Sequence, residues 1–280
     1  MPAIDLRHRN AFRTKLEMAV ELLQWAKHWL GLLKRPIWLV ADGAYAKRQM
    51  SRPAKALGIS VVSRLCKDAA LRTVPGPRPA GRRGRPRIYG EKAIDLAKRA
   101  GQKRGWSRNR FELYDGAAVK RYKTFPATWR PAGGVIQVVL VDEPHGWRAY
   151  FCTELKATVA DVLTTIADRF SLEIAFREIK EIVGAGEQQV RFIYASVGAF
   201  LVCLWTYTMT EAWAWRRSEA ELVDRTDSPW DSPTRRPSHA DKRGAWRREF
   251  LAGEILAILR SGPSDAEIQA AADRLLRLAA

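Results

Sequence analysis

The sequence predicts an α/β fold in which a helix precedes a β-α-β unit and the chain ends in a helical region. Two short, continuous apolar runs, 37–41 and 59–65, flank a helical stretch at about 45–57 that Gly58 ends. Runs of this kind are typical of strands covered on both faces, and the intervening helix predicts a right-handed crossover. Alternating, β-prone stretches follow between 110 and 153, and helical patterns fill the chain after 158.

The first element is a helix from Asn10, a good N-cap, to about Lys34, before Pro36. Apolar residues recur along it at helical spacing, so we expect an amphipathic helix that packs through one face. This face consists of Leu16, Val20, Leu23, Trp29, Leu30 and Leu33.

The composition indicates a negatively charged partner. The chain has 280 residues, and 48 Lys and Arg against 30 Asp and Glu give a net charge of +18. A globular protein this basic usually binds a polyanion, with nucleic acid ahead of a membrane surface. Cys66, Cys152 and Cys203 show no CxxC spacing and the four histidines are scattered. Isolated thiols of this kind are typical of a reducing compartment, and the spacing argues against a structural zinc site. We therefore expect a cytoplasmic, nucleoid-associated protein.

A basic segment follows the β-α-β unit. Residues 75–90, PGPRPAGRRGRPRIYG, are rich in Pro, Gly and Arg and predict an extended loop. Arg83-Gly84-Arg85-Pro86 is similar to the core of an AT-hook, in which arginines enter a narrow minor groove. The same residues also fit a loop that contacts phosphates without sequence preference, or a solvated linker that contacts no DNA. Arg83 and Arg85 are candidate DNA-binding residues in the first two of these three interpretations.

The β-prone stretches are 110–114, 119–128, 135–141 and 147–153, and the last two predict a hairpin. Basic side chains alternate with aromatic ones in the second stretch. Lys120, Arg121 and Lys123 are therefore candidate DNA contacts, although a half-buried strand gives the same pattern. Asp142 ends a strand, but its late position argues against a catalytic role.

A long helical pattern from about Thr158 to Ile182 carries three charged residues on one stripe. Thr158 is a plausible N-cap and Gly184 follows the last periodic residue. Offsets of four and eleven bring Arg169, Glu173 and Lys180 within roughly 40° of one another around the helix axis. One carboxylate between two cations suits a divalent metal ion and a phosphate, and it also suits an intrahelical salt bridge.

Residues 192–215 predict another helix, whose aromatic residues we expect in the core: Tyr194, Trp205, Tyr207, Trp213 and Trp215. Its uncharged stretch, 193–210, is as long as a membrane span, but its hydroxyl residues and the lack of a second such segment favour a buried helix. The turn-rich linker 228–239 leads to two helices, at about 242–260 and from a capping box at Ser264-x-x-Glu267.

Asp42 lies at the carboxyl end of the first apolar strand, where α/β sheets place their sites, and it could equally cap the following helix. Together with Arg169-x3-Glu173-x6-Lys180 it gives a more specific pattern. This pattern resembles the DDE transposases of bacterial insertion sequences, which carry Tyr-x2-Arg-x3-Glu-x6-Lys. VADGAYAKR at 40–48 and RFSLEIAFREIKEIVGAGEQQVR at 169–191 look like the surroundings of that group's second and third acids. The resemblance extends from FRTKLEMA at 12–19 to at least Trp215.

The resemblance implies a ribonuclease H-like catalytic core with a mostly β insertion and a helical C-terminal tail. It implies that Asp42 and Glu173 are catalytic ligands of two Mg²⁺ or Mn²⁺ ions, and that Arg169 and Lys180 hold DNA phosphates. The expected function is DNA transposition, in which the protein binds inverted-repeat ends and cuts and joins them. The partners are transposon DNA and a second transposase chain, as a homodimer or with a full-length copy, and no membrane is expected.

Two positions depart from the family pattern. Ile166 replaces the signature tyrosine, and the first catalytic Asp has no strand to carry it, because Asp5 follows only four residues. We therefore expect a core that is incomplete at its N-terminus and an impaired metal site. The alternative function is a truncated, catalytically inactive transposase that acts by DNA binding or inhibition. In chain order, the expected regions are the core at 1–65, a basic β insertion at 66–155, the core with the Glu helix at 156–227, and a linker with a helical tail at 228–280.

Overall fold

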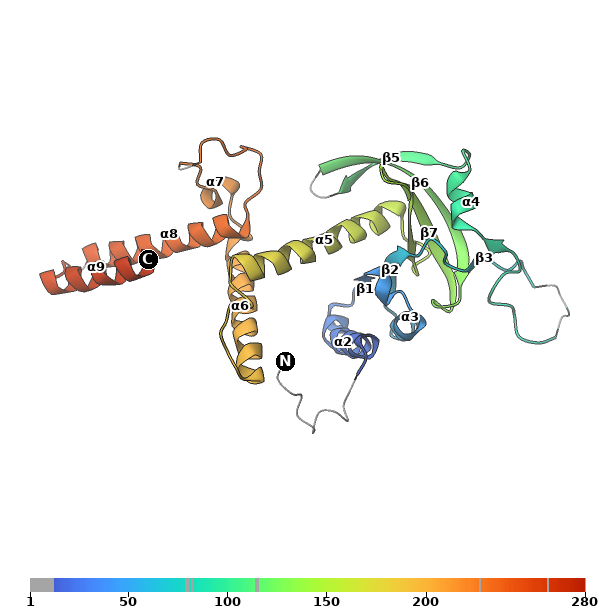
Figure 1. Ribbon diagram of the computed structural model, residues 1–280, viewed down its shortest axis with the longest axis horizontal. Helices are drawn as coiled ribbons and strands as arrows, with labels where there is room; N and C mark the ends of the chain where they lie inside the picture. Colours follow the sequence, from blue (N-terminus) through green and yellow to red (C-terminus); the bar gives the residue numbers. More distant parts are fainter. Residues whose placement is uncertain are drawn as a thin grey trace. The chain divides into compact units, whose positions relative to one another are not determined.

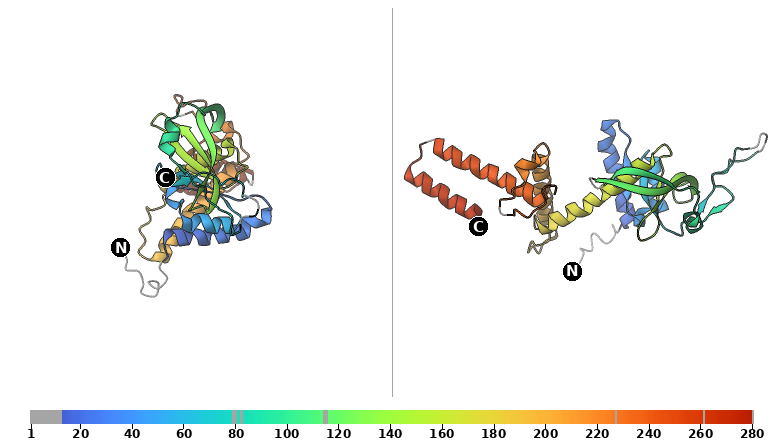
Figure 2. Two further views of the ribbon diagram at one scale, coloured as in Figure 1. Left: turned by 90° about the vertical axis from the view of Figure 1, so that its right-hand side faces the viewer. Right: turned by 90° about the horizontal axis from the view of Figure 1, so that it is seen from above.

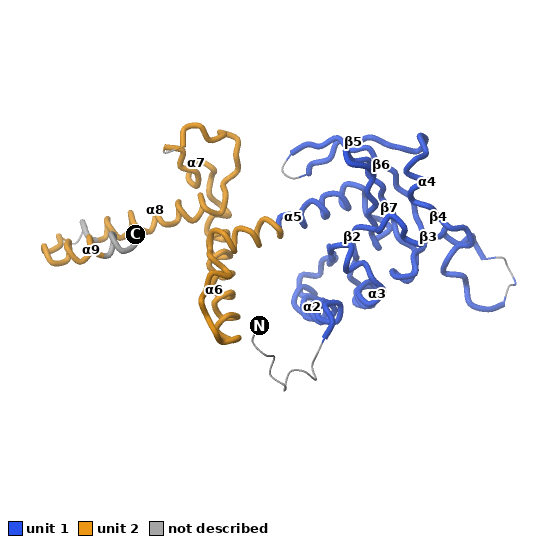
Figure 3. Tube along the Cα trace, viewed as in Figure 1, with its two compact units in different colours: residues 1–171 blue, residues 172–280 orange. Residues whose placement is uncertain are grey.

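The computed structural model of the protein describes residues 13–78, 81, 83–113, 116–226, 228–260 and 262–279. The chain forms two compact units, residues 1–171 and 172–280, and each is described by itself (Figure 3). Asp5 and the predicted helix cap Asn10 lie outside the described residues.

Unit 1 is built around one mixed sheet, which has eight strands in the described residues (Figure 1). The strands are β1 (Trp38–Ala41), β2 (Ser60–Leu65), β3 (Leu71–Arg72), β4 (Ala93–Ile94), β5 (Ser107–Leu113), β6 (Gly116–Trp129), β7 (Gly134–Asp142) and β8 (Arg148–Cys152). Their order is β1-β2-β8-β7-β6-β3-β4, and β5 pairs with the long strand β6. β1 and β2 are parallel, as the β-α-β pattern predicts, and the other pairs are antiparallel.

Alternation along the strands divides the core of unit 1 into two layers. In β2, Val61 contributes to one layer and Val62 to the other. The first layer is covered by α2 (Lys15–Leu30), α3 (Arg48–Ala56) and α4 (Leu96–Gly101). The second is covered by the first half of α5 (Val159–Glu181), which buries Val162 and Ile166. The sheet therefore has helices against both faces.

The helix α2 begins with a capping box rather than at Asn10. The Glu17 amide donates to the Thr14 hydroxyl at 3.3 Å, and the Thr14 amide donates to the Glu17 carboxylate at 2.7 Å. Of the predicted apolar face, Leu23 is buried, and Leu16 and Val20 pack partly against the core. The residues near its end are exposed in unit 1, contrary to the prediction: Trp29, Leu30 and Leu33. The helix α3 beneath has 9 residues against 16 in α2, which leaves the last turns of α2 uncovered.

Unit 2 consists of helices. After the second half of α5 come α6 (Ile193–Ala214), α7 (Glu219–Leu222), α8 (His239–Arg260) and α9 (Asp265–Ala279). The predicted capping box starts α9, where the Ser264 amide and hydroxyl both donate to Glu267 at 2.9 and 2.8 Å. The apolar core of this unit is small, and α6 meets α8 through the stacked rings of Trp213 and Trp246.

The interpretation of α6 as a buried helix needs correction. Tyr194, Trp205 and Trp215 are exposed, whereas Cys203, Thr210 and Ala214 are buried. The reason is that α6 packs along one side only, so its remaining apolar surface is open. By length and composition α6 is the one helix in the described residues able to cross a membrane, and a single such helix is weak evidence for a span.

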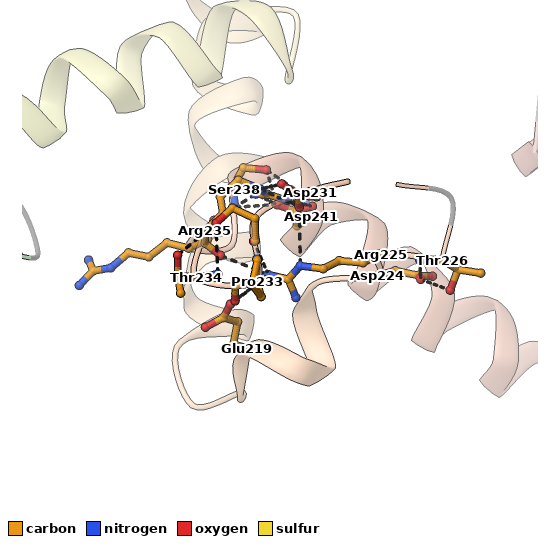
Figure 4. Close-up of polar contacts among 12 residues, drawn as sticks. Glu219, Asp224, Arg225, Thr226, Asp231, Pro233, Thr234, Arg235, Ser238 and Asp241 are labelled. Atoms are coloured by element: carbon orange, nitrogen blue, oxygen red, sulfur yellow. Dashed lines mark hydrogen bonds and ion pairs between the residues drawn. The ribbon is translucent and has the colours of Figure 1, made fainter. Parts of the chain in front are cut away.

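The segment before α8 is more ordered than the predicted linker, because two arginines fold it onto itself (Figure 4). The Arg235 guanidinium donates to Asp231 and to Asp241, at 2.7 Å in each case. Arg225 donates to the main-chain oxygens of Ser232 and Pro233 at 3.3 and 3.4 Å. Paired guanidinium and carboxylate groups thus replace the apolar core that this short segment lacks.

The predicted fold class is confirmed: a mixed α/β sheet, consistent with a ribonuclease H-like core, precedes a helical C-terminal part. The chain divides into two compact units, and the four predicted regions stay a prediction. β8 lies in the expected insertion, yet Cys152 pairs with Val62 of β2, so the core strands and the insertion share one sheet. The boundary between the two compact units falls inside α5, after Ser171.

Candidate functional site

Asp42 lies where the sequence predicts it, immediately after β1. It is the N-cap of a short 3₁₀ helix, η2 (Gly43–Tyr45), and its Oδ1 accepts a hydrogen bond from the Gly43 amide at 2.6 Å. The capping role is therefore present. Among the described residues no hydrogen-bond partner is seen for the other carboxylate oxygen, and the residue is exposed, so capping leaves Asp42 accessible to a ligand.

A cavity of about 370 Å³ opens beside Asp42. Arg64, Lys67 and Arg148 line it together with Asp42, and all three basic residues are exposed. The Lys67 ammonium lies over the Trp147 ring, 5.1 Å from its centroid. One carboxylate among three cations gives this cavity a formal excess of two positive charges, which favours binding of an anion such as a phosphate.

The sheet topology explains why these side chains meet. β1 and β2 are parallel, so Asp42, Arg64 and Lys67 all lie at the carboxyl ends of neighbouring strands. β8 runs antiparallel to β2, which brings its first residue, Arg148, to the same edge. These three cations were not predicted from the sequence. Arg64 near the end of the second apolar run and Lys67 just after it carry a usable local signal, whereas Arg148 requires the β2–β8 pairing.

The residues of this cavity do not by themselves fit a divalent metal ion. Mg²⁺ requires near-octahedral coordination by oxygen atoms, usually from one or two carboxylates, water and phosphate. Asp42 is the one carboxylate among the described residues that line the cavity. Nowhere in the described part of the chain do three or more His, Cys, Asp or Glu side chains group as a metal site.

The other predicted site residues lie on α5. Its N-terminus is capped as predicted: the Asp161 amide donates to the Thr158 hydroxyl at 3.1 Å. Glu173 and Lys180 are exposed and Arg169 is half-buried, with its guanidinium 5.1 Å from the Phe170 ring centroid. Arg169 belongs to unit 1, whereas Glu173 and Lys180 belong to unit 2. The pairing of Asp42 with Glu173 therefore stays a prediction.

The second half of α5 is held by a polar network within unit 2. Glu178 accepts hydrogen bonds from the Tyr207 hydroxyl at 3.1 Å and from the His239 amide at 3.4 Å. The His239 ring stacks on Tyr207, and its Nδ1 lies 2.8 Å from the Glu211 carboxylate. The Glu211 carboxylate also accepts a hydrogen bond from the Lys242 ammonium at 2.5 Å. Burial raises the pKa of Tyr207, and the neighbouring Glu211 and Glu178 raise it further. Burial alone would raise the pKa of Glu211, but hydrogen bonds from His239 and Lys242 lower it overall.

The basic residues of β6 differ in their surroundings. Lys120 is paired with Glu143 at 2.8 Å, and Arg121 is paired with Asp142 at 3.2 Å. Lys123 is buried, and its ammonium donates to the main-chain oxygens of two residues of the α4 region at 2.7 Å each, Arg99 and Gln102. Burial lowers the pKa of Lys123, and Arg99 and Arg121 lower it further. These contacts favour a structural role for Lys123 over the expected DNA contact.

Arg83 and Arg85 lie in the basic loop between β3 and β4, and both are exposed. They line a second, larger cavity whose lining residues are separate from those of the cavity beside Asp42. The structure thus groups Asp42 with cations that were not predicted from the sequence, and it places the two predicted loop arginines at another cavity.

The fold and these basic cavities describe an α/β protein suited to phosphate-bearing ligands. Residues 5–134, just under half of the chain, match the family described as DDE superfamily endonuclease. The match contains Asp42, the basic loop and the strands from β1 to β6, and it ends before α5. The match supports a nuclease of the DDE type, and enzymes of this superfamily act on DNA and generally use divalent metal ions. Among curated proteins, no match is found.

Proposed function

We propose that this chain is a DDE-type transposase that binds transposon ends and catalyses metal-dependent phosphodiester cleavage and strand transfer. The observation that carries the proposal is the position of Asp42. It stands at the carboxyl end of a parallel strand, within the segment that matches the DDE superfamily endonucleases, and it borders a cavity with three cations.

In this proposal Asp42 and Glu173 would together hold Mg²⁺ or Mn²⁺, and the bound ion would activate an oxygen nucleophile. Arg64, Lys67 and Arg148 neutralise the phosphate that enters the cavity beside Asp42. Arg169 and Lys180, on the helix of Glu173, are assigned to phosphates near the scissile bond.

The second candidate function is a protein of the same family that binds transposon DNA, or pairs with a full-length transposase, without cutting. Two observations favour it. Asp42 is the single carboxylate of its cavity among the described residues. Ile166, at the position of the signature tyrosine, is buried in the layer between α5 and the sheet and offers no group to a phosphate.

A nicking assay separates the two functions. Supercoiled plasmid DNA is incubated with the full chain and Mn²⁺ or Mg²⁺, with EDTA as the reference. Asp42→Asn and Glu173→Gln are compared with Glu181→Gln, which removes the same charge from an exposed position on the same helix. Metal-dependent nicking that both site variants abolish and the control retains supports the transposase proposal. DNA binding without nicking supports the second function, and nicking that the site variants leave unchanged contradicts both residue assignments.

A further inference from the structure

We propose that the cleft beneath the basic loop, whose described residues are 73–78, 81 and 83–92, binds the phosphodiester backbone of duplex DNA as a second contact apart from Asp42. This inference deepens the proposed function and depends on DNA being the ligand of the protein. The loop leaves the sheet between β3 and β4, and its two arms project beyond the strands (Figures 1 and 2).

The loop has a firmly closed base. The Gly90 amide donates to the Thr73 carbonyl at 3.0 Å, and the Thr73 amide donates to the Lys92 carbonyl at 2.9 Å. The Thr128 hydroxyl of β6 also donates to the Thr73 carbonyl, at 3.0 Å. A Cβ on Gly90 would lie 2.1 Å from that carbonyl oxygen, so only glycine permits this close crossing of the arms. Hydrogen bonds therefore fix the two ends of the loop against the sheet, so its arms start from defined positions.

The cleft between the loop and the sheet has a volume of about 990 Å³. Its cations come from three segments, and one of them, Lys55, belongs to α3 rather than to the loop. The basic residues that line it are Lys55, Arg78, Arg83, Arg85, Arg87 and Lys92. This volume far exceeds one phosphate group, and its positive charges are distributed along the cleft, as a polymer of phosphates requires.

The cleft carries little compensating negative charge. Glu91 is the one carboxylate among its described lining residues, and it is already paired with Arg87. Within the described chain, no carboxylate lies at ion-pair distance from Arg83, Arg85 or Lys92. An uncompensated field of this kind attracts a polyanion and raises its rate of association.

The floor of the cleft leaves Lys55 open to a ligand. Lys55 lies over the turn between β6 and β7, where its ammonium is 3.4 Å from the Gly133 carbonyl oxygen. Gly133 has a φ of +70°, and a Cβ on Gly134 would lie 3.2 Å from the Lys55 ammonium. Because Gly133 and Gly134 have no side chains, this turn places none between the Lys55 ammonium and the cleft. Arg52, one turn earlier on α3, donates to the Arg130 carbonyl at 3.3 Å and fixes the same helix on this turn.

The arrangement favours backbone contact over reading of the minor groove. An AT-hook requires its two arginines to enter a groove from one extended strand. Here Arg83 and Arg85 line a volume that Lys55 and Lys92 also border, so positive charge faces the ligand from the loop and from α3. Phosphates, which are the same at every base pair, fit this arrangement.

The test measures binding of fluorescein-labelled duplexes, one rich in A·T and one rich in G·C, by anisotropy in EDTA over a range of NaCl concentrations. The variants are Arg83→Gln with Arg85→Gln, and Lys55→Gln, in the full chain. We expect the double variant to bind about tenfold more weakly near 0.1 M salt and to lower the slope of log K against log salt by about 1.8, equally for both duplexes. Lys55→Gln should lower the slope by about 0.9.

Lys15→Gln with Lys27→Gln is the matched control, because it removes two charges from α2, which does not line the cleft. A loss confined to the A·T-rich duplex overturns the backbone proposal in favour of minor-groove reading. Equal affinity of wild type and variants, or no binding of duplex DNA by the wild type, overturns it altogether. Because the assay contains no metal, a failure here leaves the nicking result on Asp42 and Glu173 independent.

Discussion

The Asp42 side chain caps η2 through one oxygen and borders a basic cavity, so substitutions can separate its structural role from its proposed chemical role. Asp42→Asn keeps an oxygen for the Gly43 amide, whereas Asp42→Ala removes it. We expect Ala to cost about 1 kcal/mol of stability and Asn to cost much less, while both abolish metal-dependent nicking. Thermal melting and plasmid nicking of the same preparations test this. An Asn variant as active as wild type would leave capping as the only role of Asp42.

Lys123 gives a second prediction at this scale, because its ammonium is buried and serves two carbonyl groups near the end of α4. Lys123→Met leaves both carbonyls without this donor, so we expect a loss of about 1–3 kcal/mol in the free energy of unfolding. The affinity for duplex DNA should stay within twofold of wild type. Urea unfolding and anisotropy measure the two quantities, and weaker DNA binding with unchanged stability would restore Lys123 as a DNA contact.

The positions of single residues were predictable from the sequence only where they depend on local features of the chain. The position of Asp42 was predictable, because the end of a short apolar run is a local feature. The burial of Lys123 was not, because it depends on α4 folding back over β6, and the alternating pattern of β6 fits an exposed or a half-buried strand equally well. The cations around Asp42 were missed for a similar reason: Arg148 lies far from it in sequence and reaches it only through the pairing of β8 with β2.

At the scale of elements, the segment between α7 and α8 depends on ionised carboxylates. Burial alone would raise the pKa of Asp241, but hydrogen bonds from Arg235 and Ser238 outweigh it and lower the pKa from 3.8 to about 2. Because the folded-state pKa lies below the unfolded value, Asp241 stabilises the fold above about pH 4, and this contribution is lost as the pH falls toward 2. We expect Asp241→Asn to cost about 1 kcal/mol at pH 6, after allowance for solvent screening, and almost nothing near pH 2. Urea unfolding at both pH values tests this, and a cost independent of pH would contradict it.

The helix that carries Glu173 depends on Glu178, which joins α5 to α6 and α8. Glu178→Ala leaves the Tyr207 hydroxyl without its acceptor, so we expect a loss of about 1–3 kcal/mol. Tyr207→Phe in the Glu178→Ala background should add less than it costs in wild type, because both changes remove the same bond. Glu181→Ala, at an exposed position on the same helix, is the control and should change stability by less than about 0.5 kcal/mol. Additive costs of the two substitutions would show that the bond contributes nothing.

Most helices and strands were predictable from the sequence, but the pairing of distant strands into one sheet was not. The runs at 37–41 and 59–65 became β1 and β2, and the hairpin at 135–153 became β7 and β8, because each follows from its own pattern of side chains. The single sheet formed by these two groups required knowledge of long-range pairing. The open apolar surface of α6 was also unpredictable, since the composition of a helix does not reveal how many neighbours it has.

For the whole molecule, DNA binding should depend on where the positive charges lie as well as on the net charge of +18. Several cations are neutralised locally, as the pairs on β6 and the arginines before α8 show. The cleft beneath the basic loop is different, because four of its cations, Lys55, Arg83, Arg85 and Lys92, show no carboxylate partner within the described chain. This cleft should therefore account for much of the salt dependence of DNA binding.

This distribution predicts how binding and cleavage separate in the intact protein. With about four phosphate contacts, affinity for duplex DNA should fall about 100-fold between 50 and 200 mM NaCl. EDTA should leave that affinity within twofold of its value in Mg²⁺, because the cleft contains cations rather than metal ligands, while it abolishes any nicking. Anisotropy titrations with and without EDTA, beside the plasmid assay, measure both effects. Affinity that requires Mg²⁺ would place the main DNA contact at the carboxylates instead of the cleft, and a slope near zero would mean that charge contributes little to binding.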